Sequence, residues 1–233
     1  MNNFVAIIAA AGNSRRYSGE LPKQFLKIDG RTVLELSIRP FLDFSQCLGI
    51  CILIPPEDQY HKSLDLIGNP KIFFVEGGIS RIDSVTNGVK FWQQSELLYD
   101  HILIHDAARP CVRSYDVQKL LDSIDKEIDG VVLGIPCSDT IKKISNKDSL
   151  ILETLDRSEL WRAFTPQIFK KEVIQMNTTE NLEKKYTDEA SLVEANGGKL
   201  KMVKGFVDNI KLTFPEDLIL IKSILTSQGR LER

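Results

Sequence analysis

Five short apolar runs, each followed by a turn or by a helical pattern, constrain the fold of this chain most strongly. The runs span residues 4–8, 49–54, 72–75, 101–104 and 130–135. Strands buried on both faces have such near-continuous apolar sequences because helices cover both sides of a parallel sheet. Helical spacing separates several of the runs, over residues 32–44, 84–92 and 115–128. The sequence therefore predicts an α/β fold with a doubly wound, mostly parallel sheet.

The regular alternation of apolar runs and helical patterns ends after Pro136. Residues 138–158 are polar and charged, and two short β-like pieces flank residues 146–148. This pattern predicts a β-hairpin arm projecting from the body, with an ordinary solvated surface hairpin as the alternative. Helical patterns near Phe169 and Asp188, strand-like runs over 200–203 and 209–212, and a last helix from Pro215 complete the expected elements. A length of 233 residues without internal repeats predicts one domain, residues 1–233.

Composition excludes several classes of protein. The chain is 42% hydrophobic and 27% charged, which is typical of globular proteins and not of disordered or fibrous ones. Lys and Arg total 30 against 32 Asp and Glu, so the net charge of −2 argues against general binding to nucleic acid or membrane surfaces. Four cysteines are too few for a disulfide scaffold and are expected to be buried thiols in a reducing compartment. Without a signal-peptide pattern or a long apolar span, we expect a soluble, cytoplasmic protein.

Small residues follow the first apolar run and predict a phosphate-binding loop. The segment 9–12 reads AAAG, which lets backbone N–H groups approach phosphate oxygens closely. Arg15, Arg16 and Lys23 add positive charge beside it. In a doubly wound sheet this loop lies at the carboxyl end of a strand, where ligands bind. The loop matches neither the dinucleotide nor the P-loop fingerprint, and a glycine turn beside solvated arginines is the alternative.

The fourth apolar run ends in a second group of candidate site residues, IHDAARP. A carboxylate at the end of a strand, here Asp106, is well placed to hold Mg²⁺ against a triphosphate. The alternative is a capping aspartate paired with Arg109. His101 and His105 share one strand face, but no third ligand is evident, so a histidine metal site is not expected.

Together these motifs resemble the 2-C-methyl-D-erythritol 4-phosphate cytidylyltransferases of the non-mevalonate isoprenoid pathway. The resemblance covers nearly the whole chain through ordered blocks: AAAGNSRRYSGELPKQF from Ala9, GGISRIDSVTNGV from Gly77, HDAARP from His105, SDTIKK from Ser138, TLDRSELWRAFTPQIF from Thr154, TDEASLVEANG from Thr187 and DNIKLTFPEDL from Asp208. Two positions depart from the family pattern. Ser14 stands where many members carry Gly, and Phe164 stands where Gln is frequent.

The resemblance implies a Rossmann-like nucleotidyltransferase fold, an enzyme, and roles for individual residues. Arg16 and Lys23 match the residues that stabilise charge at the α-phosphate, and Asp106 matches the Mg²⁺-binding carboxylate. The implied CTP-binding residues are Ala10, Ala11, Gly12, Gly78, Arg81 and Ser84. The implied acceptor-binding residues are Ala107, Arg109, Thr140, Arg157, Thr165, Thr187 and Lys211.

The implied reaction is in-line attack by the phosphate of the acceptor on the α-phosphorus of CTP, with release of pyrophosphate. The resemblance also implies a homodimer whose arm, residues 138–158, brings Thr140 and Arg157 to the site of the neighbouring subunit. Three alternatives stay open at this point: transfer to ribitol 5-phosphate, a catalytically silent nucleotide-binding regulator, and a sugar nucleotidyltransferase that uses UTP or GTP. The presence of Arg16, Lys23 and Asp106 together argues against a silent regulator.

Overall fold

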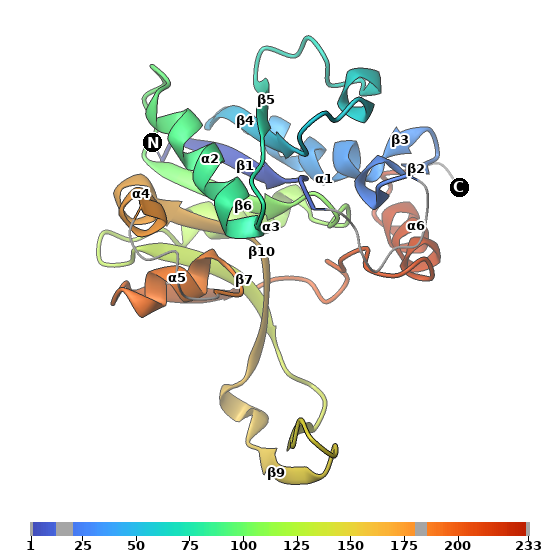
Figure 1. Ribbon diagram of the computed structural model, residues 1–233, viewed down its shortest axis with the longest axis vertical. Helices are drawn as coiled ribbons and strands as arrows, with labels where there is room; N and C mark the ends of the chain where they lie inside the picture. The colour runs from blue at the N-terminus through green and yellow to red at the C-terminus, as the bar shows by residue number, and fades with distance from the viewer. Residues whose placement is uncertain (1, 13–20, 180–185, 232–233) are drawn as a thin grey trace.

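A seven-stranded sheet forms the centre of the molecule in the computed structural model, which describes residues 2–12, 21–179 and 186–231 (Figure 1). Its strand order is β11-β7-β10-β6-β1-β4-β5. The strands are β1 (Phe4–Ala9), β4 (Cys47–Ile54), β5 (Ile72–Glu76), β6 (His101–Asp106), β7 (Gly130–Pro136), β10 (Trp161–Lys170) and β11 (Leu200–Lys204). All neighbours pair in parallel except β10, which is antiparallel to both β6 and β7. The five predicted apolar runs are all strands of this sheet, so the predicted fold class is confirmed.

Helices cover both faces of the sheet, as the double-sided burial of its strands requires. They are α1 (Val33–Leu42), α2 (Arg81–Gln93), α3 (Ser114–Asp122), α4 (Lys171–Thr179), α5 (Glu189–Ala195) and α6 (Asp217–Ser227). Phe4, Ala6 and Ile8 of β1 pack in the core beneath α1 and α3, whereas Val5 and Ile7 pack in the core beneath α2, α4 and α5. Helix α6 packs instead on the outer side of α1.

Capping residues in the sequence fix where two of these helices begin. The Thr32 hydroxyl accepts the N–H of Glu35, whose carboxylate accepts the N–H of Thr32, and this capping box starts α1. Ser80 and Asp83 form the same arrangement at the start of α2. As a result, the first turn of α2 begins directly after the loop that follows β5.

Several predicted elements differ from the structure. A proline inside a helical pattern is expected to shorten or kink the helix, but α1 continues through Pro40 to Leu42. Helix α3 ends at Asp122, well before residue 128, because residues 123–128 form turns that place Ile124 and Ile128 against the core. The predicted strand over 209–212 is wrong: its backbone hydrogen-bonds to the backbone of Phe206 and Ala108 and to the side chains of Arg109 and Lys23, not to a strand of the sheet. Helix α6 begins at Asp217, not Pro215: the carboxylate of Asp217 accepts the N–H groups of Thr213 and Phe214, which hold the preceding turn.

Two strand pairings were not expected from the sequence. Strand β10 runs through a segment whose proline, Pro166, lies at a shift in pairing register with β7. A proline within an apolar run argues against a strand inside a sheet, because it cannot donate a hydrogen bond to the neighbouring strand. Pro166 is accommodated because it lies at the shift in register. The short strands β2 (Lys27–Ile28) and β3 (Arg31–Thr32) form a separate hairpin before α1.

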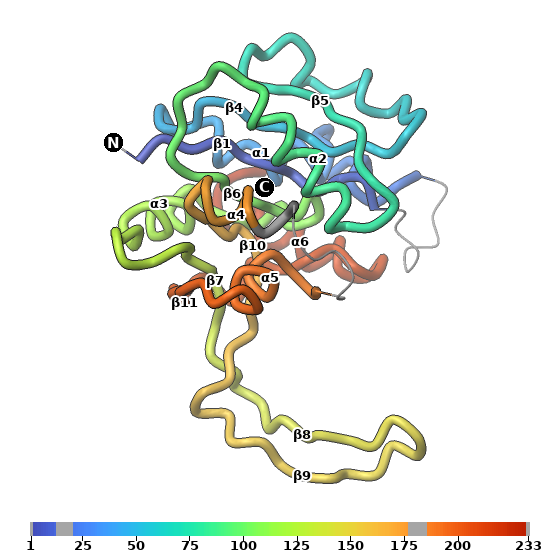
Figure 2. The backbone as a smooth tube through the Cα atoms, turned by 60° about the vertical axis from the view of Figure 1, so that its left-hand side comes forward, coloured from blue at the N-terminus to red at the C-terminus, as the bar shows by residue number. Residues whose placement is uncertain are grey.

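The predicted arm is present. Strands β8 (Ile141–Ile144) and β9 (Ile151–Leu155) pair antiparallel as a sheet of their own. Figures 1 and 2 show this hairpin extending away from the body beyond the ends of β7 and β10. None of the described helices is long and apolar enough to span a membrane. The four cysteines are free thiols; Cys47, Cys51 and Cys111 are buried as predicted, whereas Cys137 is only partly buried.

Candidate active site

A cleft of about 920 Å³ opens at the carboxyl edge of the sheet, where β1, β4, β5 and β6 end. Chain order along the sheet reverses between β1 and β6, and doubly wound folds bind ligands at this switch point. The cleft is lined by residues 9–12, 55–56, 76–81 and 106–108, with Lys23, Gln24, Ser84, Lys211 and Thr213. The two motifs singled out in the sequence, after β1 and after β6, therefore lie side by side at one cavity, because Ala9 and Asp106 are partners in neighbouring strands.

Asp106 is the centre of a charge cluster in this cleft. Its Oδ2 accepts from the Nζ of Lys211 at 2.9 Å and the Nε of Arg109 at 3.1 Å, and its Oδ1 lies 3.5 Å from the Nη2 of Arg81. Burial alone would raise the pKa of Asp106, but these three cations hold it well below its usual range. The carboxylate is therefore charged at every physiological pH and positions three cations at one end of the cleft.

Arg81, in the first turn of α2, bridges two carboxylates. It pairs with Glu189 at the start of α5, which is only 2% exposed, and it also reaches Asp106. Burial would lower the pKa of Arg81, but Glu189 and Asp106 raise it above its ordinary value. Sequence reasoning missed Glu189. The available signal was an acidic residue in the TDEASLVEANG block, at the start of an expected helix.

A network of hydrogen bonds behind Asp106 holds three distant segments together. The guanidinium of Arg109 donates to the carbonyl of Asn209 at 2.9 Å, and the amide of Asn209 donates to the carbonyl of Thr165 at 3.0 Å. The backbone N–H of Asp106 donates to the Thr165 hydroxyl at 3.0 Å. Asn209, another residue that sequence reasoning missed, thus connects the segment that carries Lys211 to the turn after β6 and to β10.

His105 belongs to the core under this network. Its Nδ1 lies 3.1 Å from the Thr165 hydroxyl, and burial lowers the pKa of His105 to about 3, so the ring is neutral. Among the described residues, no group of three or more His, Cys, Asp or Glu side chains is placed to hold a metal ion.

The first loop lies against the turn after β5. A Cβ atom on Gly77 would come within 2.4 Å of the Ala11 Cβ, so only glycine permits this approach. The amide of Gln24 donates to the carbonyl of Ala10 at 2.8 Å, and the N–H of Gly78 donates to the Ser84 hydroxyl at 2.9 Å. Small residues therefore line the cleft both in the loop after β1 and in the turn after β5.

Lys23 connects this loop to the opposite wall. Its Nζ donates to the carbonyl of Leu212 at 2.6 Å, directly after Lys211 in the chain. Lys23 and Lys211, to which the family resemblance gives different substrates, therefore line the same cleft. Arg16 falls outside the described residues.

The structure brings most of the other predicted residues to this cleft. Those that line it are Ala10, Ala11, Gly12, Lys23, Gly78, Arg81, Ser84, Asp106, Ala107 and Lys211, with Arg109 and Thr165 bonded to Asp106. Three predicted residues lie elsewhere. Thr140 and Arg157 are on the projecting arm, where the Arg157 guanidinium donates to the Ser138 carbonyl, and Thr187 is exposed before α5.

The donor set suits a magnesium ion that arrives with an anionic ligand. Mg²⁺ is commonly held by one or two carboxylates together with substrate phosphates. Asp106 supplies one charged carboxylate in the cleft, and Glu76 lines it as well. Because cations already contact both Asp106 oxygens, phosphate oxygens would have to provide most of the coordination.

Comparison with known proteins identifies the family. Residues 4–227 match the family model described as 2-C-methyl-D-erythritol 4-phosphate cytidylyltransferase. The chain belongs to this family. It is 37% identical to the 2-C-methyl-D-erythritol 4-phosphate cytidylyltransferase of Vibrio vulnificus, over 98% of this chain and 97% of that one. It is 40% identical to the protein of that name from Escherichia fergusonii, over 95% and 93% of the two chains.

Solved structures agree with this assignment. A crystal structure of a 4-diphosphocytidyl-2C-methyl-D-erythritol synthase superposes with a TM-score of 0.83 at 31% identity and covers 97% of this chain and 99% of that one. The Francisella tularensis 2-C-methyl-D-erythritol 4-phosphate cytidylyltransferase superposes with a TM-score of 0.80 at 30% identity, over 96% and 100% of the two chains. The family resemblance predicted from the ordered motifs is confirmed.

Proposed function

We propose that the protein transfers a cytidylyl group from CTP to 2-C-methyl-D-erythritol 4-phosphate, giving 4-diphosphocytidyl-2-C-methyl-D-erythritol and pyrophosphate. The observation that carries this proposal is the match to the family over residues 4–227, which includes every element that builds the cleft. The relatives named above carry this activity in their names, and none of them favours ribitol 5-phosphate as acceptor.

The cleft supports binding of CTP along the first loop. The small residues 9–12 leave room for phosphates beside Lys23, and the first turn of α2 adds Arg81 and the positive end of a helix dipole. We propose that Ser84 and the backbone around Gly78 contact the nucleotide from the facing turn. Arg16 is proposed to join Lys23 at the α-phosphate. Mg²⁺, held by Asp106 and the triphosphate, would neutralise phosphate charge.

Lys211 supports binding of the acceptor phosphate, because its ammonium is held beside the phosphate-binding loop by Asp106. An acceptor phosphate oxygen forms a bond to the α-phosphorus of CTP, while the bond from that phosphorus to the β-phosphate breaks and pyrophosphate leaves. A phosphate monoester is already anionic at neutral pH, so the attack needs no general base. Positioning and charge neutralisation by Lys23, Arg16 and Lys211 carry the catalysis.

We propose further that the protein is a homodimer joined through the arm. Thr140 and Arg157, both expected to bind acceptor, belong to the arm and are not among the described residues that line the cleft of their own chain. The arm also exposes apolar side chains to solvent, with Ile144, Leu150, Ile151 and Leu152 between 49% and 64% exposed. Exposed apolar groups of this kind mark interaction surfaces, and a two-fold arrangement would place each arm at the neighbouring cleft.

Subunit mixing tests the shared site. Lys23→Ala and Arg157→Ala are expected to be nearly inactive as separate proteins. When they are unfolded and refolded together, half of the dimers are mixed, and one site in each mixed dimer carries neither change. About a quarter of all sites should therefore recover. If Arg157 serves its own subunit, mixing restores nothing, and a monomer at working concentration would also refute the proposal.

Substrate dependence tests the reaction itself. Pyrophosphate release is measured with CTP, UTP, GTP and ATP, each combined with methylerythritol phosphate or with ribitol 5-phosphate. We expect turnover only with CTP and methylerythritol phosphate, and dependence on Mg²⁺. Faster turnover with ribitol 5-phosphate, or with another nucleotide, would contradict the proposed substrates.

We also propose that the protein works in the cytoplasm, since its cysteines are free thiols and suit a reducing compartment. Thiol labelling of protein isolated under non-reducing conditions should find all four cysteines reduced. A disulfide in that protein would count against this location.

A further inference from the structure

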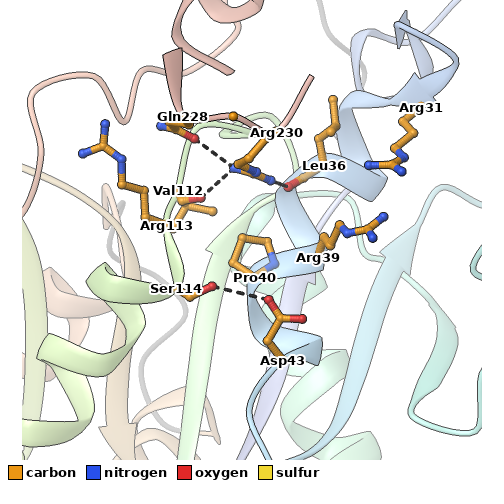
Figure 3. A pocket seen from close by; sticks show the side chains of 11 residues that line it. Arg31, Leu36, Arg39, Pro40, Asp43, Val112, Arg113, Ser114, Gln228 and Arg230 are labelled. Carbon is orange, nitrogen blue, oxygen red and sulfur yellow. Dashed lines mark hydrogen bonds between the residues drawn. The ribbon is translucent and has the colours of Figure 1, made fainter. Parts of the chain in front are cut away.

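A second cavity of about 650 Å³ lies apart from the cleft, between α1, the segment after β6 and the end of α6 (Figure 3). It shares no lining residue with the cleft. Among the described residues, its charged lining consists of four arginines and one aspartate: Arg31, Arg39, Arg113, Arg230 and Asp43. We call it the arginine cavity. The chain as a whole carries a net charge of −2, so this concentration of positive charge is local.

Arg230 forms a fixed wall of the arginine cavity. Its guanidinium donates to the carbonyls of Leu36 at 2.6 Å, Pro110 at 2.7 Å and Val112 at 2.9 Å. The carbonyl of Leu36 is available because Pro40, four residues later, has no N–H to donate to it. All of these acceptors are neutral, so they orient Arg230 without neutralising its charge.

Arg31 and Arg39 add two further positive charges to the cavity. Both side chains are exposed, and neither makes an ion pair within residues 2–12, 21–179 and 186–231. Figure 3 shows their guanidinium groups together on one side of the cavity. Arg113 differs, because it pairs with Asp208 and stacks on the Phe206 ring.

The single aspartate lies at the other end of the cavity. Asp43 accepts a hydrogen bond from the Ser114 hydroxyl at 3.5 Å and makes no ion pair with the arginines. Burial lowers the pKa of Arg230 most, and repulsion from the nearby charges of Arg39 and Arg31 lowers it further, whereas Cys111 and Asp43 act in the opposite direction. A bound anion would relieve this repulsion.

We propose that the arginine cavity binds a small di- or polyphosphate anion through Arg31, Arg39 and Arg230. Guanidinium groups match phosphate oxygens with paired hydrogen bonds, and three of them around one cavity suit a ligand with several negative charges. The cavity volume falls within the range of small-ligand sites, and Leu36, Pro40 and Val112 provide an apolar lining that strengthens the charge interactions.

Calorimetric titration with inorganic triphosphate at constant ionic strength tests this site. The test variant is Arg31→Gln/Arg39→Gln. The control is Lys90→Gln/Lys201→Gln, which removes the same charge from exposed lysines on α2 and β11. The test variant should bind one triphosphate fewer per chain than wild type, or bind it at least tenfold more weakly. The control should match wild type in both stoichiometry and affinity.

Two results would overturn the proposal. One is equal triphosphate stoichiometry and affinity in wild type and in Arg31→Gln/Arg39→Gln. The other is an equal loss in the lysine control, which would make the effect one of net charge alone. Because neither arginine lines the cleft, turnover of the test variant without added triphosphate should match wild type and shows that the variant is folded.

Discussion

Replacing Asp106 by asparagine keeps the shape of the side chain and removes the negative charge that Lys211, Arg109 and Arg81 share. Removing one partner of a buried ion pair costs about 3–5 kcal/mol, because the remaining charge is left buried without compensation. The side chains of Lys211 and Arg81 are 37% and 31% exposed, so water screens part of this cost. We expect the free energy of unfolding to fall by about 3 kcal/mol, at the lower end of that range.

Urea unfolding at pH 7, followed by circular dichroism, measures this loss. The control is Asp29→Asn, whose carboxylate pairs with an exposed lysine, Lys222, and should contribute less than about 1 kcal/mol. Inorganic triphosphate without added metal should stabilise Asp106→Asn more than wild type, because it replaces the missing charge, while the arginine cavity contributes equally to both. A loss no larger than that of Asp29→Asn would refute the idea that Asp106 organises the cations of the cleft.

Three further changes have defined outcomes. Lys23→Ala should lower kcat about a hundredfold, roughly 3 kcal/mol of transition-state stabilisation, and an unchanged kcat with a raised KM for CTP would contradict this. The folded-state pKa of His105 is depressed to about 3, so the unfolded chain binds a proton first and stability falls as pH drops below about 6.5. Between pH 7.5 and 5, the free energy of unfolding of wild type should therefore fall by about 2 kcal/mol more than that of His105→Gln. An equal fall in both proteins, measured by urea unfolding, would contradict this. Ile151→Asp, on the exposed face of the arm, should weaken dimerisation at least tenfold in sedimentation equilibrium, and unchanged association would exclude this face from the interface.

The sheet could be predicted because each parallel strand is buried on both faces and leaves a continuous apolar run in the sequence. The cleft could be predicted because the carboxyl ends of such strands meet at one edge. Strand β10 carries no such signal: residues 161–163 are exposed, and Pro166 interrupts the run. The segment 209–212, in contrast, has a strand-like pattern but forms no strand. Leu212 is buried as a strand residue would be, yet its N–H donates to the carbonyl of Ala108.

Contacts between distant residues could not be predicted from local sequence. Glu189 at the start of a helix is typical of an acid that interacts with the helix dipole, and only the fold brings it to Arg81. The arginine cavity depends in the same way on Arg230 meeting Arg31 and Arg39 across nearly the full length of the chain. Local sequence patterns therefore predict helices, strands and the sheet edge where ligands bind, whereas contacts between distant charged residues depend on tertiary packing.

Direct transfer of the cytidylyl group within one cleft is the central claim, and stereochemistry at the α-phosphorus tests it most directly. The substrate is CTP with sulfur in place of one non-bridging α-oxygen, as a single stereoisomer, and the configuration of the product is read by phosphorus NMR. One in-line displacement by the acceptor phosphate predicts inversion at that phosphorus. Retention would require two displacements through a covalent enzyme intermediate and would contradict a mechanism based on positioning and charge alone.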